Sequence, residues 1–227
     1  MNRTLIRLGS ISMLSLGVLA AVGCTSDASK MAAANPWFGA AYETSEASLD
    51  NTARLGADLN VKDSGNETPL HKAASLDNAI AVRYFARHGA NLEAVDEDLQ
   101  TPLHFACDKS KVAAAKALIE AGANVNARDE DGKTPLMHAA EEGDTEVVNA
   151  LLAKQAEVDA KDNNGWTALI YAADDDRADA VRSLLRAGAN PAAIDKKGQT
   201  AMMHAVDESQ GNAIRALQEG AASKQLP

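Results

Sequence analysis

The chain is poor in cysteine and in aromatic side chains, and its basic residues are outnumbered by acidic ones. Cys24 and Cys107 are its two cysteines, too few for the disulfide framework of a small secreted domain. Lysine and arginine number 22 against 32 acidic residues, which argues against nucleic acid as a partner because nucleic-acid-binding proteins carry basic stripes. The sequence contains no Gly-x-Ser-x-Gly, phosphate-loop, His-Glu-x-x-His or dinucleotide-binding motif. We therefore expect no enzyme, no cofactor and no metal site.

What the sequence has in abundance is repetition, at a constant interval of 33 residues. A six-residue motif, which reads TPLHKA in its first copy, starts at Thr68, Thr101, Thr134, Thr167 and Thr200. A leucine or methionine stands two residues after each motif threonine, and an alanine stands five residues after it. A sequence that repeats in this way folds as a stack of similar units, each burying its apolar face against its neighbours. Such a stack presents an elongated binding surface rather than a catalytic pocket.

The interval and the Thr-Pro-Leu-His-x-Ala motif resemble those of the ankyrin repeat over residues 35–224. The resemblance implies an all-α solenoid of about six helix-turn-helix units with β-hairpin fingers, acting as a monomeric, non-catalytic protein-binding module. We expect units to start near residues 35, 68, 101, 134, 167 and 200, and residues 225–227 to form a tail. The first unit is degenerate, and its polar second helix, from about Ser45 to Arg54, suits a terminal unit that faces water.

Two units depart from the turn chemistry of the others. The later units carry a turn glycine at Gly132, Gly165 and Gly198, whereas Asn66 and Leu99 replace it in two earlier units. Where such a turn is left-handed, a residue with a β-carbon costs on the order of 1 kcal/mol. Leu99, a large apolar residue at a finger tip, is therefore a candidate contact for a partner.

In the last four copies of the motif, acidic residues begin two positions after the final alanine. The set comprises Asp108, Glu141, Glu142, Asp174, Asp175, Asp207 and Glu208. The ankyrin resemblance implies that this end of the first helix faces a concave groove, where the carboxylates would form a ladder. Negative potential along the ladder would attract a basic protein and speed its association. The alternative is a row of solvated helix ends that keeps the protein soluble.

The residue before each motif threonine supplies the second part of this candidate binding surface. From the second unit to the sixth it is Glu67, Gln100, Lys133, Trp166 and Gln199. Trp166 is the strongest candidate, because a large aromatic side chain on a loop is a frequent hot spot of protein interfaces. The alternative for Trp166 is packing against a neighbouring finger. We count Gln100, Lys133 and Trp166 among the predicted partner-binding residues.

The motif histidines and the second cysteine have simpler interpretations. For His71 and His104 the resemblance implies a hydrogen bond within the repeat, and no second ligand stands at the spacing of a metal site. Cys107 occupies a position held by Ala74 and Ala140 in other units. We expect a buried small residue there rather than a reactive thiol.

The first 23 residues are typical of a secretory signal peptide, with Arg3 and Arg7 ahead of an apolar run too short to span a bilayer. The sequence Ala-Val-Gly-Cys that ends at Cys24 resembles a bacterial lipobox, which implies lipidation of Cys24. Thr25 follows rather than aspartate, which favours an outer-membrane anchor facing the periplasm. Residues 24–34 would then be a lipidated tether, and the membrane would be contacted through the lipid alone. The alternative is cleavage by the general signal peptidase, giving a soluble periplasmic or secreted protein.

Two functions fit these expectations. The first is a periplasmic scaffold or assembly factor that binds a basic, exported protein. The second is an immunity lipoprotein that neutralises a toxin delivered to the periplasm, such as a phospholipase. Both are protein-binding roles, and the sequence does not identify the partner.

Replacing Cys24 by serine tests the anchor. The variant is expected to lose membrane attachment, because serine cannot receive the thioether-linked lipid, while the repeats stay folded. Fractionation of cell envelopes measures this, with a Cys107→Ser variant as the control that keeps its anchor. A Cys24→Ser protein that remains in the membrane fraction would contradict the lipoprotein hypothesis.

Overall fold

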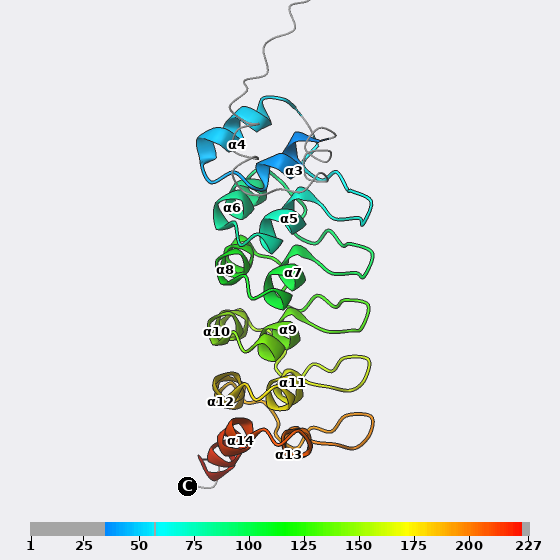
Figure 1. The fold of residues 1–227 in the computed structure, drawn as a ribbon, viewed down its shortest axis with the longest axis vertical. Helices are drawn as coiled ribbons and strands as arrows, with labels where there is room; N and C mark the ends of the chain where they lie inside the picture. The colour runs from blue at the N-terminus through cyan, green and yellow to red at the C-terminus, as the bar shows by residue number, and fades with distance from the viewer. Residues whose placement is uncertain (1–34, 57, 224–227) are drawn as a thin grey trace, which may run out of the picture.

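The computed structural model describes residues 35–56 and 58–223, which form six helical pairs stacked along one axis (Figure 1). We call these pairs units 1 to 6, and the two members of each pair its inner and outer helix. The inner helices are α3 (Pro36–Ala40), α5 (Pro69–Ser75), α7 (Pro102–Asp108), α9 (Pro135–Glu142), α11 (Ala168–Asp174) and α13 (Ala201–Asp207). The outer helices are α4 (Glu46–Ala53), α6 (Ala79–Arg87), α8 (Val112–Ala121), α10 (Thr145–Ala153), α12 (Ala178–Arg186) and α14 (Gly211–Ser223). The expected all-α solenoid of helix-turn-helix units is confirmed.

The expected signal peptide (1–23), tether (24–34, with Cys24) and tail (225–227) lie outside the described residues. Within the described part, no helix combines the length and the apolar character needed to cross a membrane.

Each inner helix from unit 2 onward begins directly after a motif threonine, and the hydroxyls of Thr68, Thr167 and Thr200 cap their helices. The Thr68 hydroxyl accepts a hydrogen bond from the His71 N–H, and His71 Nδ1 accepts one from the Thr68 N–H at 3.1 Å. Pro69 takes the first helical position, where the N–H that proline lacks has no partner in any helix. The cap satisfies donors that a helix start otherwise leaves unpaired. The motif itself therefore sets where each unit begins.

The core runs through the stack between the inner and outer helices. On its inner side the motif leucines and alanines are buried: Leu70, Leu103, Leu136, Leu169, Ala73, Ala106, Ala139, Ala172 and Ala205. Because alanine is small, neighbouring inner helices approach closely, while larger residues such as Phe85 and Leu118 fill the outer side. Trp37 stands at the leucine position of unit 1 and packs edge-on against Phe85, with ring centroids 5.5 Å apart. Unit 1 thus joins the same core.

The fingers project from the inner-helix side (Figure 1), but they are loops rather than β-strand hairpins. Within the described residues they contain no strand, and one isolated antiparallel bridge joins Ile194 to Thr200. An aspartate at the start of each finger explains this. In unit 5, Asp162 Oδ1 accepts the N–H groups of Asn164 and Trp166 at 2.8 and 2.7 Å. The side chain thus takes donors that a strand partner would otherwise satisfy.

Backbone hydrogen bonds join the finger tips of units 3 to 6 in a row. The Glu130 N–H donates to the Asp98 carbonyl at 2.9 Å, and the Lys196 N–H donates to the Asn164 carbonyl at 3.0 Å. A bond of the same kind joins units 4 and 5, from the Asn163 N–H. The tips therefore keep a fixed spacing along the stack.

Leu99 lies in the left-handed region with φ of 59°, at the turn position where Gly132 has φ of 75°. Its side chain is 48% exposed. The strained position therefore places an apolar side chain in solvent.

Replacing Leu99 by glycine is expected to raise the free energy of unfolding by about 1 kcal/mol, because glycine has no β-carbon to strain the turn. Leu99→Ala keeps the β-carbon and is the matched control, which should show no such gain. Urea unfolding of the three proteins measures the difference. Equal stabilities of the glycine and alanine variants would show that the turn stores no strain.

Candidate functional site

One face of the stack lies between the fingers and the inner helices, and most of the predicted site residues are on it. Lys133, at the base of the unit 4 finger, forms an ion pair with Glu141 in the last turn of α9, with Nζ and Oε2 2.7 Å apart. In unit 6 the Gln199 amide donates to Asp207 at 3.0 Å from the equivalent positions. The acidic ends of the inner helices therefore point toward the fingers. We call this surface the finger-side face.

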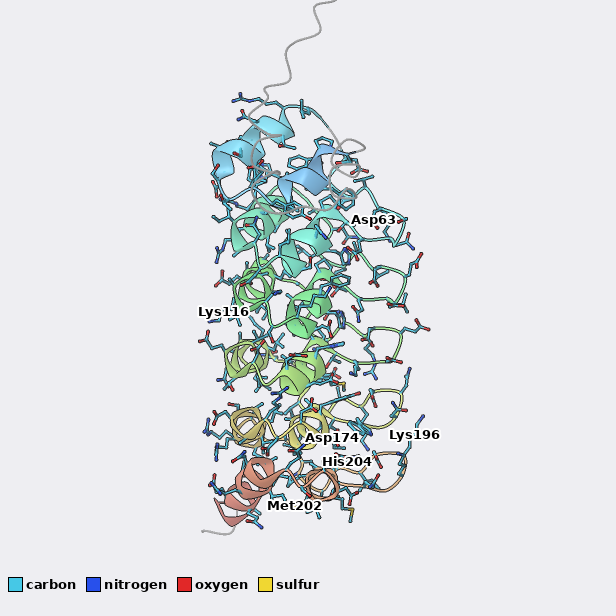
Figure 2. All side chains as sticks on the ribbon, viewed as in Figure 1. Asp63, Lys116, Asp174, Lys196, Met202 and His204 are labelled. Carbon is cyan, nitrogen blue, oxygen red and sulfur yellow. The ribbon has the colours of Figure 1, made fainter. Side chains whose placement is uncertain are left out.

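Histidines of the following unit hold two further predicted carboxylates. Asp108 of unit 3 lies 3.6 Å from His138 Nδ1 in unit 4. Asp174 of unit 5 lies 3.3 Å from His204 Nδ1 in unit 6, and Figure 2 shows this pair side by side on α11 and α13. The neighbouring His138 ring is the main reason why the pKa of Asp108 lies below its usual range. The predicted ladder is thus partly neutralised by groups of the protein itself.

The remaining acids of the predicted set differ from one another. Asp175 and Glu208 are exposed and form no ion pair within the described residues. Burial, together with the nearby Glu141 and Asp174 carboxylates, raises the pKa of Asp175. Glu142 instead accepts a hydrogen bond from Ser110 Oγ at 3.3 Å and lines a polar depression of about 350 Å³ beside the starts of the outer helices.

Each of the two histidines also binds a second carboxylate, from its own finger. His138 Nε2 lies 2.9 Å from Asp129 Oδ2, and His204 Nε2 lies 3.1 Å from Asp195 Oδ2. In unit 5 a tyrosine takes the histidine position, and the Tyr171 hydroxyl donates to Asp162 at 2.8 Å. Burial is the largest influence on the pKa of His138 and lowers it, but the neighbouring Asp108 and Asp129 carboxylates outweigh it and raise the pKa.

The sequence predictions did not include the finger aspartates as part of this face. The signal was present, because an aspartate recurs at the 33-residue interval: Asp63, Asp96, Asp129, Asp162 and Asp195. The aspartate closes the finger turn and also binds a histidine or tyrosine ring of the inner helix. The second role can be recognised only when the contact with that ring is known.

The indole ring of Trp166 lies within the finger-side face rather than at a finger tip. The ring is half-buried and packs against Tyr171 and His204, with centroid distances of 4.9 and 4.5 Å. It therefore bridges units 5 and 6 while one part of it remains accessible. An accessible aromatic ring held by neighbouring rings is a preorganised contact surface.

The other predicted finger residues are placed as follows. Lys133 Nζ lies over the Tyr171 ring, 4.4 Å from its centroid, as well as beside Glu141. Gln100 is half-buried at the finger base, where its backbone carbonyl accepts a hydrogen bond from His71. Leu99 lies at the tip of the unit 3 finger, away from the acidic helix ends.

His71 and His104 are buried and connect neighbouring units as well as capping their own helices. His71 Nε2 donates to the Gln100 carbonyl at 3.0 Å, and His104 Nε2 donates to the Lys133 carbonyl at 3.3 Å. Burial lowers the pKa of His104 to about 4. Cys107 is also fully buried, and burial raises the pKa of its thiol. Within residues 35–56 and 58–223, no group of three or more His, Cys, Asp or Glu side chains is arranged to hold a metal ion.

The opposite, outer-helix surface carries charges that pair with one another between units. Arg83 lies 3.7 Å from Glu120, Lys116 lies 2.5 Å from Glu146, and Figure 2 shows Lys116 on this side. Arg182 and Glu219 join units 5 and 6 in the same way at 3.0 Å. These cations and anions satisfy each other across unit boundaries.

A protein-family model described as ankyrin repeats (3 copies) matches residues 37–129 and 136–226, which together make up most of the chain. No match was found among curated proteins.

The buried His104 makes stability depend on pH. Its pKa is about 4 when folded and about 6.5 when unfolded, so the unfolded chain takes up the proton first as the pH falls. The stability linked to neutral His104 is present above about pH 6.5 and is lost between about pH 6.5 and pH 4, by roughly 2–3 kcal/mol. Met137 holds the same position in unit 4, so His104→Met is the matched control. Urea unfolding at several pH values should show a shallower loss in the variant, and equal slopes would contradict the assignment.

Proposed function

Since the chain belongs to the ankyrin-repeat family, whose repeats generally mediate binding to other proteins, we propose that it is a non-catalytic module that binds a basic protein on its finger-side face. The observation that carries the proposal is the unequal pairing of charge on the two sides of the stack. Arg83, Lys116 and Arg182 of the outer helices pair with acidic residues of a neighbouring unit. The exposed Asp175 and Glu208, at the ends of inner helices, have no ion pair within the described residues.

The exposed Asp175 supports this proposal. Burial raises the pKa of Asp175, Glu141 and Asp174 add to the rise, and the nearby Arg177 and Lys133 oppose it. A lysine or arginine of a partner would pair with the Asp175 carboxylate and strengthen the binding. Trp166, half-buried nearby in the same unit, offers apolar contact area beside the charges.

The proposal includes a place in the cell. Lipidation at Cys24 would hold the stack in the periplasm on the outer membrane, with residues 24–34 as a tether. Eleven residues reach at most about 40 Å, so the repeats would work close to the membrane without entering it. There the protein would act as a monomeric scaffold or assembly factor for an exported protein.

Charge reversal on the two faces tests the binding surface. Asp175→Lys combined with Glu208→Lys is expected to slow association of the partner about tenfold at low salt, because the steering potential of the finger-side face is reversed. Glu120→Lys combined with Glu146→Lys changes the net charge by the same amount on the outer helices and should change the rate little.

The partner is first captured from an envelope extract with the unmodified chain as bait, and its association rate is then measured with all three proteins. A partner lost only by the finger-side variant supports the proposal, and its identity distinguishes an exported enzyme from a toxin. Equal effects of the two double variants would place the binding surface elsewhere.

A further inference from the structure

His138 and His204 each contact a carboxylate of the preceding unit. They therefore also set how many carboxylates the finger-side face can offer. Resting on the function proposed above, we propose that protonation of His138 and His204 regulates binding at the finger-side face. At acidic pH the charged rings hold Asp108 and Asp174, and at neutral to alkaline pH they release both carboxylates for a cationic partner.

The inference follows from the unequal burial of the two carboxylates that each ring contacts. The Asp129 side chain is 4% exposed and the Asp108 side chain 45%, on opposite sides of the His138 ring. The Asp195 and Asp174 side chains, on either side of His204, are 1% and 30% exposed. In each unit, the carboxylate of the finger is internal and the carboxylate of the preceding unit belongs to the surface.

The number of hydrogen-bond donors on the ring decides which carboxylate is held. A protonated imidazole donates from both nitrogens, whereas a neutral imidazole has one donor and one acceptor. The single donor of the neutral ring is required by the second oxygen of the buried finger aspartate, because a buried carboxylate oxygen without a partner is costly. The lone pair on the other nitrogen then faces Asp108 or Asp174 and repels it. The exposed carboxylate is therefore the one released.

Other groups around the rings do not prevent this change. His138 faces Asp108 and His104 from α7, and Asp129 and Lys133 from its own finger. Lys133 opposes its charge, but the two carboxylates outweigh Lys133 and burial, so the pKa of His138 is raised. His104 stays neutral above about pH 5 because burial lowers its pKa to about 4.

His204 has a similar environment. It faces Asp174 from α11, Asp195 from its own finger and the Trp166 ring from the finger of unit 5. His204 therefore lies between one buried and one more exposed carboxylate, as His138 does.

Unit 5 provides a version of the same position that does not titrate in this range. Tyr171 donates its hydroxyl to Asp162, as the histidines do to Asp129 and Asp195, and burial, with the hydrogen bond to Asp162, raises its pKa further. The carboxylate of the preceding unit, Glu141, pairs with Lys133 instead. A tyrosine at position 138 or 204 should thus preserve the bond to the finger and abolish the response to pH.

The test uses the full chain and a ten-residue lysine peptide as probe, with calorimetric binding at low salt at about pH 5.5 and about pH 8. The unmodified protein should bind the peptide about three- to tenfold more tightly at the higher pH, because two positive charges leave the face. The double variant His138→Tyr, His204→Tyr should bind with nearly the same affinity at both pH values. His71, His88 and His104 are present in both proteins, so their contributions cancel.

An NMR titration of the imidazole rings in the unmodified chain provides a second measurement that does not depend on the variant folding. The His138 ring should gain its proton at a higher pH than an unperturbed histidine, because its pKa is raised. A His138 ring that does not, peptide affinity independent of pH, or an equal response in the double variant would each overturn the regulation while leaving the proposed function in place. A peptide that fails to bind the unmodified protein at either pH would overturn the acidic binding face, and with it this inference.

Discussion

Contact between successive units is the constraint on which the rest of this structure depends. A single pair of short helices buries too little apolar surface to be stable by itself, so each unit is held by its neighbours. Small residues such as Ala106 and Ala139 allow the inner helices to approach, and His71 and His104 add hydrogen bonds to the backbone of the next finger. The same 33-residue interval that aligns the apolar stripe also aligns these polar bonds.

Polar groups of the finger-side face serve both the stack and the proposed binding. Carboxylates at the ends of inner helices are unfavourable with the helix dipole. Lys133, His138 and His204 offset this by pairing with Glu141, Asp108 and Asp174. The surface is consequently less uniformly acidic than the sequence suggests. A partner would contact both free carboxylates and carboxylates that are paired within the protein. The same residues therefore contribute to stability and to the proposed recognition.

Most of the fold followed from the sequence, because repetition makes local rules consistent over the whole chain. The motif threonine predicts each inner-helix start from unit 2 onward, and the structure has it there from Thr68 to Thr200. The candidate site was less accessible to prediction. Trp166 was expected at an outward tip and lies half-buried between two rings. The finger aspartates were missed, although their interval was visible in the sequence. Aspartate is common in turns, and only the structure shows that its second oxygen binds a histidine or tyrosine.

By itself, the sequence determined the units, their order, the helix starts and the apolar stripe, all of which depend on short-range spacing and on the period. Only the tertiary structure decided which charges meet. Asp108 and His138 lie 30 positions apart in the chain, and so do Asp174 and His204, with no local pattern to connect them. Stacking brings the end of one inner helix against the middle of the next. That contact decides whether a carboxylate is free for a partner or held by a ring.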